Sequence, residues 1–332
     1  MIRGLPHFKQ LLRAREAGIA VMLVVFSLSV GVREPRFLSA ETLRIVLLAT
    51  PLLLMAAMGE MTVVIARHVD LSIGSILGFS AFLAGLTMRD HPEWPLLVSF
   101  GVAVLSGAGL GCLNGLLVTL FKLPSIIVTL GTLSLCRGAL FTISGGRQID
   151  PNDIPESLIR MARTSPIGIP WIVIIAFAIA AFTHLFLRHS LLGRQIYALG
   201  SNPTAASLRG LRVVPLNLLV FTLSGALAGL AGILYAARFG YVNPGVTGVG
   251  FEFTVIAAVV IGGVSIQGGA GSTLGTVLGV MLLGAVTVAL SVLGVSGLWQ
   301  NAIYGGIIVL ALIIDRTVRS GGVRDLLARA FL

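Results

Sequence analysis

Long apolar runs separated by short polar turns make up most of this chain. Ten such runs can be marked, with edges defined to within a few residues: 17–32, 43–66, 71–88, 96–120, 125–143, 168–188, 214–237, 251–263, 272–293 and 299–315. Several of them reach the roughly 20 residues that an α-helix needs to cross a bilayer. The pattern predicts an all-α polytopic membrane protein of about ten transmembrane helices, of which the first is retained rather than cleaved.

Two of the junctions between apolar runs are unusual. The sequence RHVDLSIGS, Arg67 to Ser75, joins the second and third runs, and GGVSIQGGAGS, Gly262 to Ser272, joins the eighth and ninth. The flanking sequences TVVIARHVDLSIGS and TVIAAVVIGGVSIQGGAGS resemble each other faintly. Irregular backbone at membrane depth needs protein or water to satisfy its amides, and paired interruptions often mark a transport path. We therefore expect broken helices at both places.

Small residues recur at four-residue spacing along three of the predicted helices. These stripes consist of Gly107, Gly111 and Gly115, of Gly225 and Gly229, and of Gly275 and Gly279. The spacing places each stripe on one helix face, where two backbones can approach closely. The stripes predict tight helix packing rather than a function.

Composition and charge agree with this membrane class. The 332 residues are 56% hydrophobic and 11% charged, whereas soluble domains carry about 25% charged residues. The net charge of +10 does not indicate nucleic acid, because the arginines lie mainly in loops, where they orient the helices. With the N-terminus inside, most Lys and Arg residues fall on the cytoplasmic side. We expect one transmembrane domain, 1–332, with cytoplasmic tails at 1–16 and 316–332.

The sequence lacks the motifs of common enzyme classes. It contains neither a GxxxxGK[ST] phosphate loop nor an HExxH pair. Cys112 and Cys136 lie in apolar runs and make no metal framework. GVSG, Gly294 to Gly297, resembles a rhomboid-protease serine motif, but no histidine follows His189. We expect no catalytic residue, no cofactor and no metal.

Polar and ionisable residues within the apolar runs are energetically costly and are therefore candidates for a substrate pathway. A path for a hydroxyl-rich solute needs a few polar groups among apolar walls. The candidates are Glu60, Asp70, Ser72, Asn114, Arg137 and Glu252. The same residue types can instead serve structure, as ion pairs or as caps of exposed helix amides. The sequence leaves both roles open.

One polar stretch, LLGRQIYALGSNPTAASLRGLRV (191–213), interrupts the apolar pattern on the predicted cytoplasmic side. Asn202 is a favourable N-cap, Pro203 suits the first helical position and Gly210 suits the position after a helix. The pattern predicts a helix from Pro203 to Arg209. Because seven residues cannot hold a helix alone in water, this helix must be braced by its own protein or by a partner.

Four sequence blocks resemble a known transporter family. GRQIYALGSNPTAASLRGLRV is similar to the cytoplasmic coupling loop in permease subunits of ribose-type ATP-binding-cassette (ABC) sugar importers. RHVDLSIGSILG resembles that family's GGIDLSVGS signature, and LPSIIVTLGTLSLCRG and VIGGVSIQGGAGSTLGTVLG are further blocks in the same order. Together they cover most of the chain, about Phe37 to Asp315. The form RHVDLSIGSI is closer to the permeases for rhamnose and for autoinducer-2.

The resemblance implies an ABC importer permease fold, type II-like, in the bacterial inner membrane. It implies cytosolic ATP-binding subunits, a periplasmic substrate-binding protein and a second permease that is either identical or different. The solute would be a pentose or deoxyhexose, such as ribose or rhamnose, or the sugar-like autoinducer-2. The loop 189–213 would contact the ATPase through Arg194, Asn202, Pro203, Ala205, Ala206, Arg209 and Gly210.

This family implies alternating access driven by a separate ATPase. The loop 144–167, with a short surface helix predicted at IPESLIRMA, is the candidate docking surface for the binding protein. The alternative is an ion-coupled secondary transporter or channel that works without an ATPase. In that case Glu60, Arg137 and Glu252 would serve as a proton or ion relay.

Overall fold

The computed structural model describes residues 15–164, 168–296, 299, 302–306 and 309. Most of this part is helical, and its one β-type contact is an isolated antiparallel bridge between Ile149 and Val242. Of the predicted tails, residues 1–14 and 316–332 lie outside the described residues.

Helices occupy nine of the ten predicted runs, and the last run, 299–315, lies largely outside the described part of the chain. In chain order the elements are α2 (Arg15–Arg33), η1 (Pro35–Leu38), α3 (Ala40–Ala49), α4 (Pro51–Ile65), α5 (Ile73–Asp90), α6 (Leu96–Leu120), α7 (Ser125–Ser144), η2 (Pro151–Asp153), α8 (Glu156–Arg163), α9 (Trp171–His189), α10 (Leu191–Ser201), α11 (Pro203–Leu208), α12 (Val213–Phe239), α13 (Phe251–Ile261) and α14 (Thr273–Val292).

Among the described residues, six helices are long and apolar enough to cross a membrane: α2, α6, α7, α9, α12 and α14. The pair α3 and α4, bent by 42° at its break, makes a seventh. The predicted apolar run 43–66 is thus divided between two helices. Pro51 begins α4, and a proline disturbs a continuous helix because it lacks the amide hydrogen that the preceding turn would bond.

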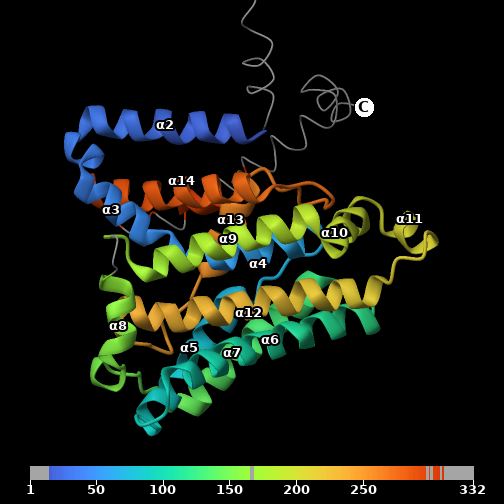
Figure 1. Cartoon of the computed structure of the whole chain (residues 1–332), viewed down its shortest axis with the longest axis horizontal. Helices are drawn as coiled ribbons and strands as arrows, with labels where there is room; N and C mark the ends of the chain where they lie inside the picture. Colours follow the sequence, from blue (N-terminus) through green and yellow to red (C-terminus); the bar gives the residue numbers. More distant parts are fainter. Residues whose placement is uncertain (1–14, 165–167, 297–298, 300–301, 307–308, 310–332) are drawn as a thin grey trace, which may run out of the picture.

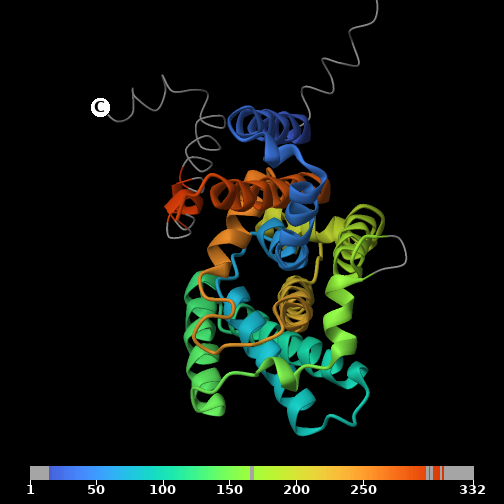
Figure 2. The ribbon, with the colours of Figure 1, turned by 90° about the vertical axis from the view of Figure 1, so that its left-hand side faces the viewer.

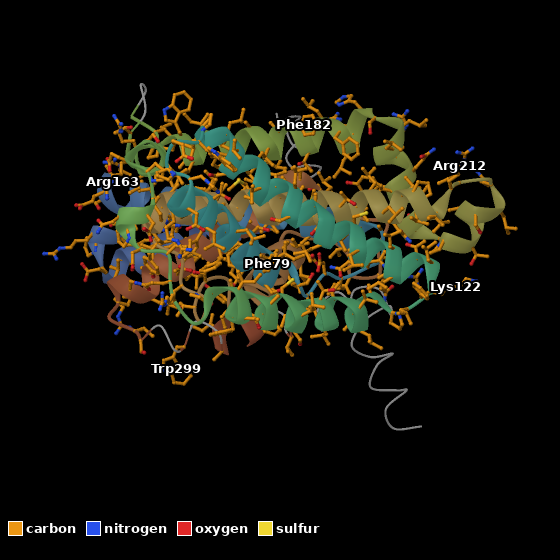
Figure 3. All side chains as sticks on the ribbon, turned by 90° about the horizontal axis from the view of Figure 1, so that it is seen from below. Phe79, Lys122, Arg163, Phe182, Arg212 and Trp299 are labelled. Carbon is orange, nitrogen blue, oxygen red and sulfur yellow. The ribbon has the colours of Figure 1, made fainter. Side chains whose placement is uncertain are left out.

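The helical body has two distinct ends (Figure 1). Helix α11 lies at one end and α8 at the other, so we call these the α11 end and the α8 end. Figure 3 shows Lys122 and Arg212 at the α11 end and Arg163 at the α8 end. Lys122, between α6 and α7, and the loop 189–213 therefore share one end of the molecule.

Helix α4 forms the centre of the body. All 15 of its residues are buried, and its neighbours include α9, α12, α13 and α14. Figure 2 shows how α2 and α14 lie on one side of this centre, while α5, α6 and α7 lie on the other. A helix that is apolar around its whole circumference can be enclosed by other helices on every side, and this position is compatible with that pattern.

The predicted glycine stripes pack two long helices together. A methyl group on Gly107 of α6 would overlap the carbonyl oxygen of Gly225 in α12. The same is true in the opposite direction, because a methyl group on Gly225 would overlap the carbonyl oxygen of Gly107. The stripes therefore bring α6 and α12 into direct backbone contact, which confirms the packing prediction.

Gly107→Ala is expected to destabilise the protein by about 1–3 kcal/mol, because the added methyl group must separate two backbones. The loss would be measured as a lower melting temperature of the detergent-solubilised chain. Gly109→Ala is the matched control, since a methyl group at that position of the same helix meets no atom within 4 Å. Equal melting temperatures for the two variants would contradict the packing argument.

Candidate functional site

Four of the predicted pathway residues meet at the first interruption, between α4 and α5. The backbone amide of Asp70 donates to Glu60 Oε1 at 3.1 Å. Asp70 Oδ1 accepts from the backbone amide of Ser72 at 2.9 Å and from the Ser72 hydroxyl. Asn114 Nδ2 in α6 donates to Ser72 Oγ at 2.9 Å. We call Glu60, Asp70, Ser72 and Asn114 the polar chain.

Two helix residues that the sequence analysis did not select extend the polar chain. The Thr132 hydroxyl in α7 donates to Asn114 Oδ1. Ser224 in α12 donates to Asp70 Oδ2 at 3.4 Å. No sequence signal distinguishes these hydroxyls from others in the apolar runs. The network thus connects α4, α6, α7 and α12 across the interior.

The polar chain is closed to solvent in this conformation. All four of its side chains have no exposed surface. Within the described residues, Glu60 Oε2 is buried without a hydrogen-bond partner. A buried acceptor left without a hydrogen bond is energetically costly. A role of Glu60 in a substrate pathway stays a prediction.

Arg137 and Glu252 form a separate group. Arg137 Nη1 in α7 donates to the backbone carbonyl of Thr247 at 2.8 Å. Glu252 is 6% exposed in the first turn of α13. A methyl group on Gly74, in the first turn of α5, would overlap both Glu252 Oε2 and the carbonyl oxygen of Gly248. The structure therefore divides the six candidate residues into two groups, both adjacent to the start of α5.

The two interrupted regions contact each other. The amide of Gly269, in the second interruption, donates to the carbonyl of Ile65 at 2.9 Å. A methyl group on Gly268 would lie 2.8 Å from Cβ of Arg67. Backbone amides in both irregular segments thus find partners within the protein, which irregular backbone needs wherever water is absent.

Helix α10 packs directly against both interruptions. The Tyr197 hydroxyl donates to the carbonyl of Gly271 at 2.9 Å. Burial raises the pKa of this phenol, which keeps its proton available for the bond. A methyl group on Gly200 would overlap the carbonyl oxygen of Ile65 and lie 2.6 Å from the amide nitrogen of Gly269. Gly200 therefore permits a contact between α10 and both interruptions that no larger residue allows.

The sequence analysis missed α10 although its signals were present. The Ser190 hydroxyl accepts from the amide of Gly193 at 2.9 Å, which is the bond of a helix N-cap. The buried residues Gly193, Ile196 and Gly200 follow helical spacing. These features could have identified a second helix in the polar stretch.

The predicted short helix is confirmed as α11. Asn202 Oδ1 accepts from the amide of Ala205 at 3.0 Å, and Gly210 has a φ of 81°. The helix ends at Leu208, one residue earlier than expected. Ala206 is buried, whereas the Leu208 side chain is 83% exposed at the α11 end.

The other residues assigned to the coupling loop lie on the same end of the molecule. Pro203 occupies the first turn of α11, Ala205 and Arg209 are exposed, and Arg194 is exposed on α10. The fold offers them as a contact surface, and their role toward an ATPase stays a prediction.

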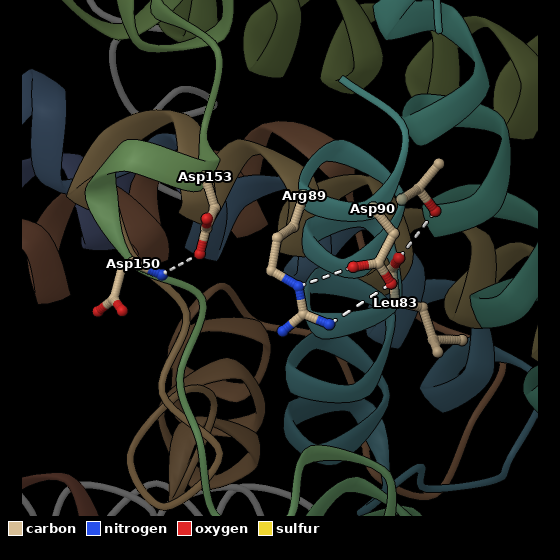
Figure 4. A network of polar contacts seen from close by, with 6 residues as sticks. Leu83, Arg89, Asp90, Asp150 and Asp153 are labelled. Carbon is tan, nitrogen blue, oxygen red and sulfur yellow. Dashed lines mark hydrogen bonds and ion pairs between the residues drawn. The ribbon is translucent and has the colours of Figure 1, made fainter. Parts of the chain in front are cut away.

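Charged side chains at the end of α5 and around η2 form local polar contacts (Figure 4). Arg89 Nε donates to Asp90 Oδ1 at 2.8 Å, and this bond holds the pKa of the Asp90 carboxyl below its ordinary value. The amide of Asp150 donates to Asp153 Oδ2 at 3.0 Å. The predicted surface helix is present as α8, while residues 165–167 of the loop lie outside the described residues. Docking of a binding protein here stays a prediction.

A comparison with family models gives the decisive match. Residues 42–312 match the family described as Branched-chain amino acid transport system / permease component. The chain belongs to this permease family. It is thus a multi-pass membrane permease subunit of an ABC importer and not an enzyme, as the sequence analysis predicted. In the part that the structure describes, no group of three His, Cys, Asp or Glu residues could hold a metal ion.

Curated relatives of the permease are similar along nearly its whole length. The autoinducer 2 import system permease protein LsrC of Escherichia coli (strain K12 / DH10B) is 33% identical over 94% of this chain and 90% of the relative. LsrC of Enterobacter sp. (strain 638) is 34% identical over 94% and 89%. LsrC of Yersinia enterocolitica is 33% identical over 96% and 87%. No solved structure was found to match the permease.

Proposed function

We propose that this permease carries a small sugar-like solute across the bacterial inner membrane, with autoinducer-2 as the first candidate. The observation that carries this proposal is the 33–34% identity to autoinducer 2 import permeases over 94% of the chain. The RHVDLSIGSI block supports the same branch of the family. Ribose and rhamnose are the further candidates.

The proposed assembly contains two permeases, identical or different, with cytosolic ATP-binding subunits and a periplasmic binding protein. In it the permease has about ten transmembrane segments of a type II-like fold. Both tails and the coupling loop 189–213 face the cytoplasm. Lys122 and Arg212 at the α11 end support this orientation, because basic residues favour the cytoplasmic side.

The contacts of α10 and α11 support a route by which movement of the ATPase would reach the interior of the permease. The exposed Leu208 and Arg209 offer a surface for the ATPase. Only Asn202 separates α11 from α10, and α10 touches both interruptions at Gly200. Displacement of α11 would therefore shift the segment that carries Asp70 and open the polar chain. A partner can drive this change only if it binds the two conformations with different affinity.

Reconstitution tests the function. Proteoliposomes that contain the permease, its ATPase and its binding protein are expected to accumulate autoinducer-2 only with ATP. Rhamnose and ribose would be measured in parallel to define the solute. Accumulation by the permease alone, driven by an ion gradient, would contradict the proposal and favour a secondary transporter.

Disruption of α11 is expected to uncouple ATP hydrolysis from uptake. Gly210→Val forces a branched side chain into a left-handed backbone conformation, and Arg209→Glu reverses a charge on the exposed surface. Uptake should fall by about tenfold or more, equivalent to about 1.4 kcal/mol or more of lost coupling, while ATPase activity persists. Arg33→Glu, at an exposed position at the end of α2, is the control. Parental uptake by both α11 variants would exclude the coupling role.

A further inference from the structure

A cavity of about 300 Å³ opens at the α8 end of the permease. Its wall is formed by the last turns of α12, the first turn of α4, the segment 248–251 and part of α14. Small-molecule sites measure about 300–1,000 Å³, so this cavity has the size for a small solute. It lies apart from the polar chain.

The wall contains a basic side chain without a carboxylate partner. Arg238 lies in the last turn of α12, with its guanidinium carbon 5.0 Å from the centre of the Phe239 ring. Among the described residues it forms no ion pair. An arginine that is partly desolvated in a membrane protein is costly unless its donors are used. An N–H group of this guanidinium that is not used within the protein can donate to oxygen atoms of a ligand.

The other polar groups on the wall are hydroxyls. Thr254 lies in α13, close to the segment 248–251. The hydroxyls of Thr287 and Tyr304 hydrogen-bond to each other. Hydroxyls both donate and accept, which suits the hydroxyls of a sugar. Among the described residues that line the cavity, Arg238 has no second basic neighbour that would favour a phosphate group. The rings of Tyr235 and Phe239 offer apolar faces to the carbon side of the same ligand.

The segment that contains Gly248 lines the cavity and also contacts the start of α5. Gly248 and Gly250 line the cavity, and the neighbouring Thr247 carbonyl accepts the bond from Arg137. Gly248 also packs directly against Gly74 at the start of α5. The segment around Gly248 would therefore separate a solute in the cavity from the first interruption.

We propose that this cavity binds a small polyhydroxylated solute of furanose or pyranose size, with Arg238 donating to its oxygen atoms. The inference rests on the proposed function and deepens it by naming a solute site on the α8 side of the permease. The Thr254 hydroxyl adds a second hydrogen-bonding group, and Thr287 keeps one acceptor position beside its bonds to Leu283 and Tyr304. Arg238 supplies the strongest contact.

Protection of an introduced thiol tests the site. Thr254→Cys is combined with Cys112→Ala and Cys136→Ala in the complete importer, reconstituted without nucleotide. A membrane-impermeant thiol reagent is applied with autoinducer-2, rhamnose, ribose or inorganic phosphate. At least one of the three sugar-like solutes should slow labelling of Thr254→Cys, whereas phosphate should not. Val246→Cys is the matched control, because Val246 is 62% exposed in the loop that precedes α13 but does not line the cavity.

A second substitution tests the assigned donor. Adding Arg238→Gln should raise the solute concentration that gives half protection by about tenfold, as expected for loss of a charged hydrogen bond. Arg238→Lys should raise it less. Equal protection with and without Arg238→Gln would show that Arg238 does not bind the solute.

The outcomes separate the solute site from the transport function. If no solute slows labelling of the Thr254→Cys variant while the importer still takes up solute with ATP, the proposed site is wrong. The proposed function is then unaffected. Protection by phosphate alone overturns the assigned solute class. Absence of ATP-driven uptake in the parental importer contradicts the proposed function itself.

Discussion

Gly200→Val is expected to abolish uptake and to destabilise the permease by about 3 kcal/mol, the upper part of the range for overpacked interiors. Gly200 faces the carbonyl of Ile65 and the amide of Gly269, both of which are backbone groups. Neither can move aside as the end of a flexible side chain can. The valine must therefore push α10 away from both interruptions.

The effect would be measured as ATP-driven uptake and as the melting temperature of the solubilised chain. Gly131→Val in α7 is the control, because a methyl group at Gly131 meets no atom within 4 Å. Gly200→Ala should give an intermediate loss. Parental uptake and melting temperature for Gly200→Val would show that α10 does not depend on this close contact.

Asp70→Ala is expected to destabilise the permease by about 3 kcal/mol or more. The change leaves the amide and hydroxyl of Ser72 and the hydroxyl of Ser224 without their acceptor. Each buried donor left unpaired costs about 1–3 kcal/mol. Uptake should be lost as well, since Ser72 would no longer be positioned for Asn114.

Asp70→Asn is the matched variant for this test. Its side-chain oxygen can still accept from Ser72, so its melting temperature should stay near that of the parent. Thermal unfolding in detergent and uptake in proteoliposomes would be compared for both variants. A melting temperature for Asp70→Ala equal to that of Asp70→Asn would refute a structural role for the bonds to Ser72.

Local sequence signals predicted several elements closely. Asn202, Pro203 and Gly210 defined α11 to within one residue, because a helix cap is a contact between chain neighbours. The glycine stripes identified the faces on which α6 and α12 meet. The bend at Pro51 and the helix α10 were missed, although Pro51 and Ser190 provided signals for both.

The candidate site was predicted only in part. Glu60, Asp70, Ser72 and Asn114 were selected because polar groups are rare in apolar runs, and the structure joins them. Arg137 and Glu252 were selected for the same reason but form a separate group beside the start of α5. Thr132 and Ser224 belong to the network yet carry no distinguishing signal, because a hydroxyl in a helix can also bond its own backbone.

The sequence by itself determined the helical membrane class, the two interruptions, the α11 helix and the family resemblance. These features follow from residue type and from spacing along the chain. Only the tertiary structure decided that the two interruptions touch, that Gly200 lies between them and that Arg238 borders a cavity. Such contacts join residues far apart in sequence, and apolar helices with similar periodicity can pack in many arrangements. The choice among these arrangements depends on the shapes of all the packed surfaces together.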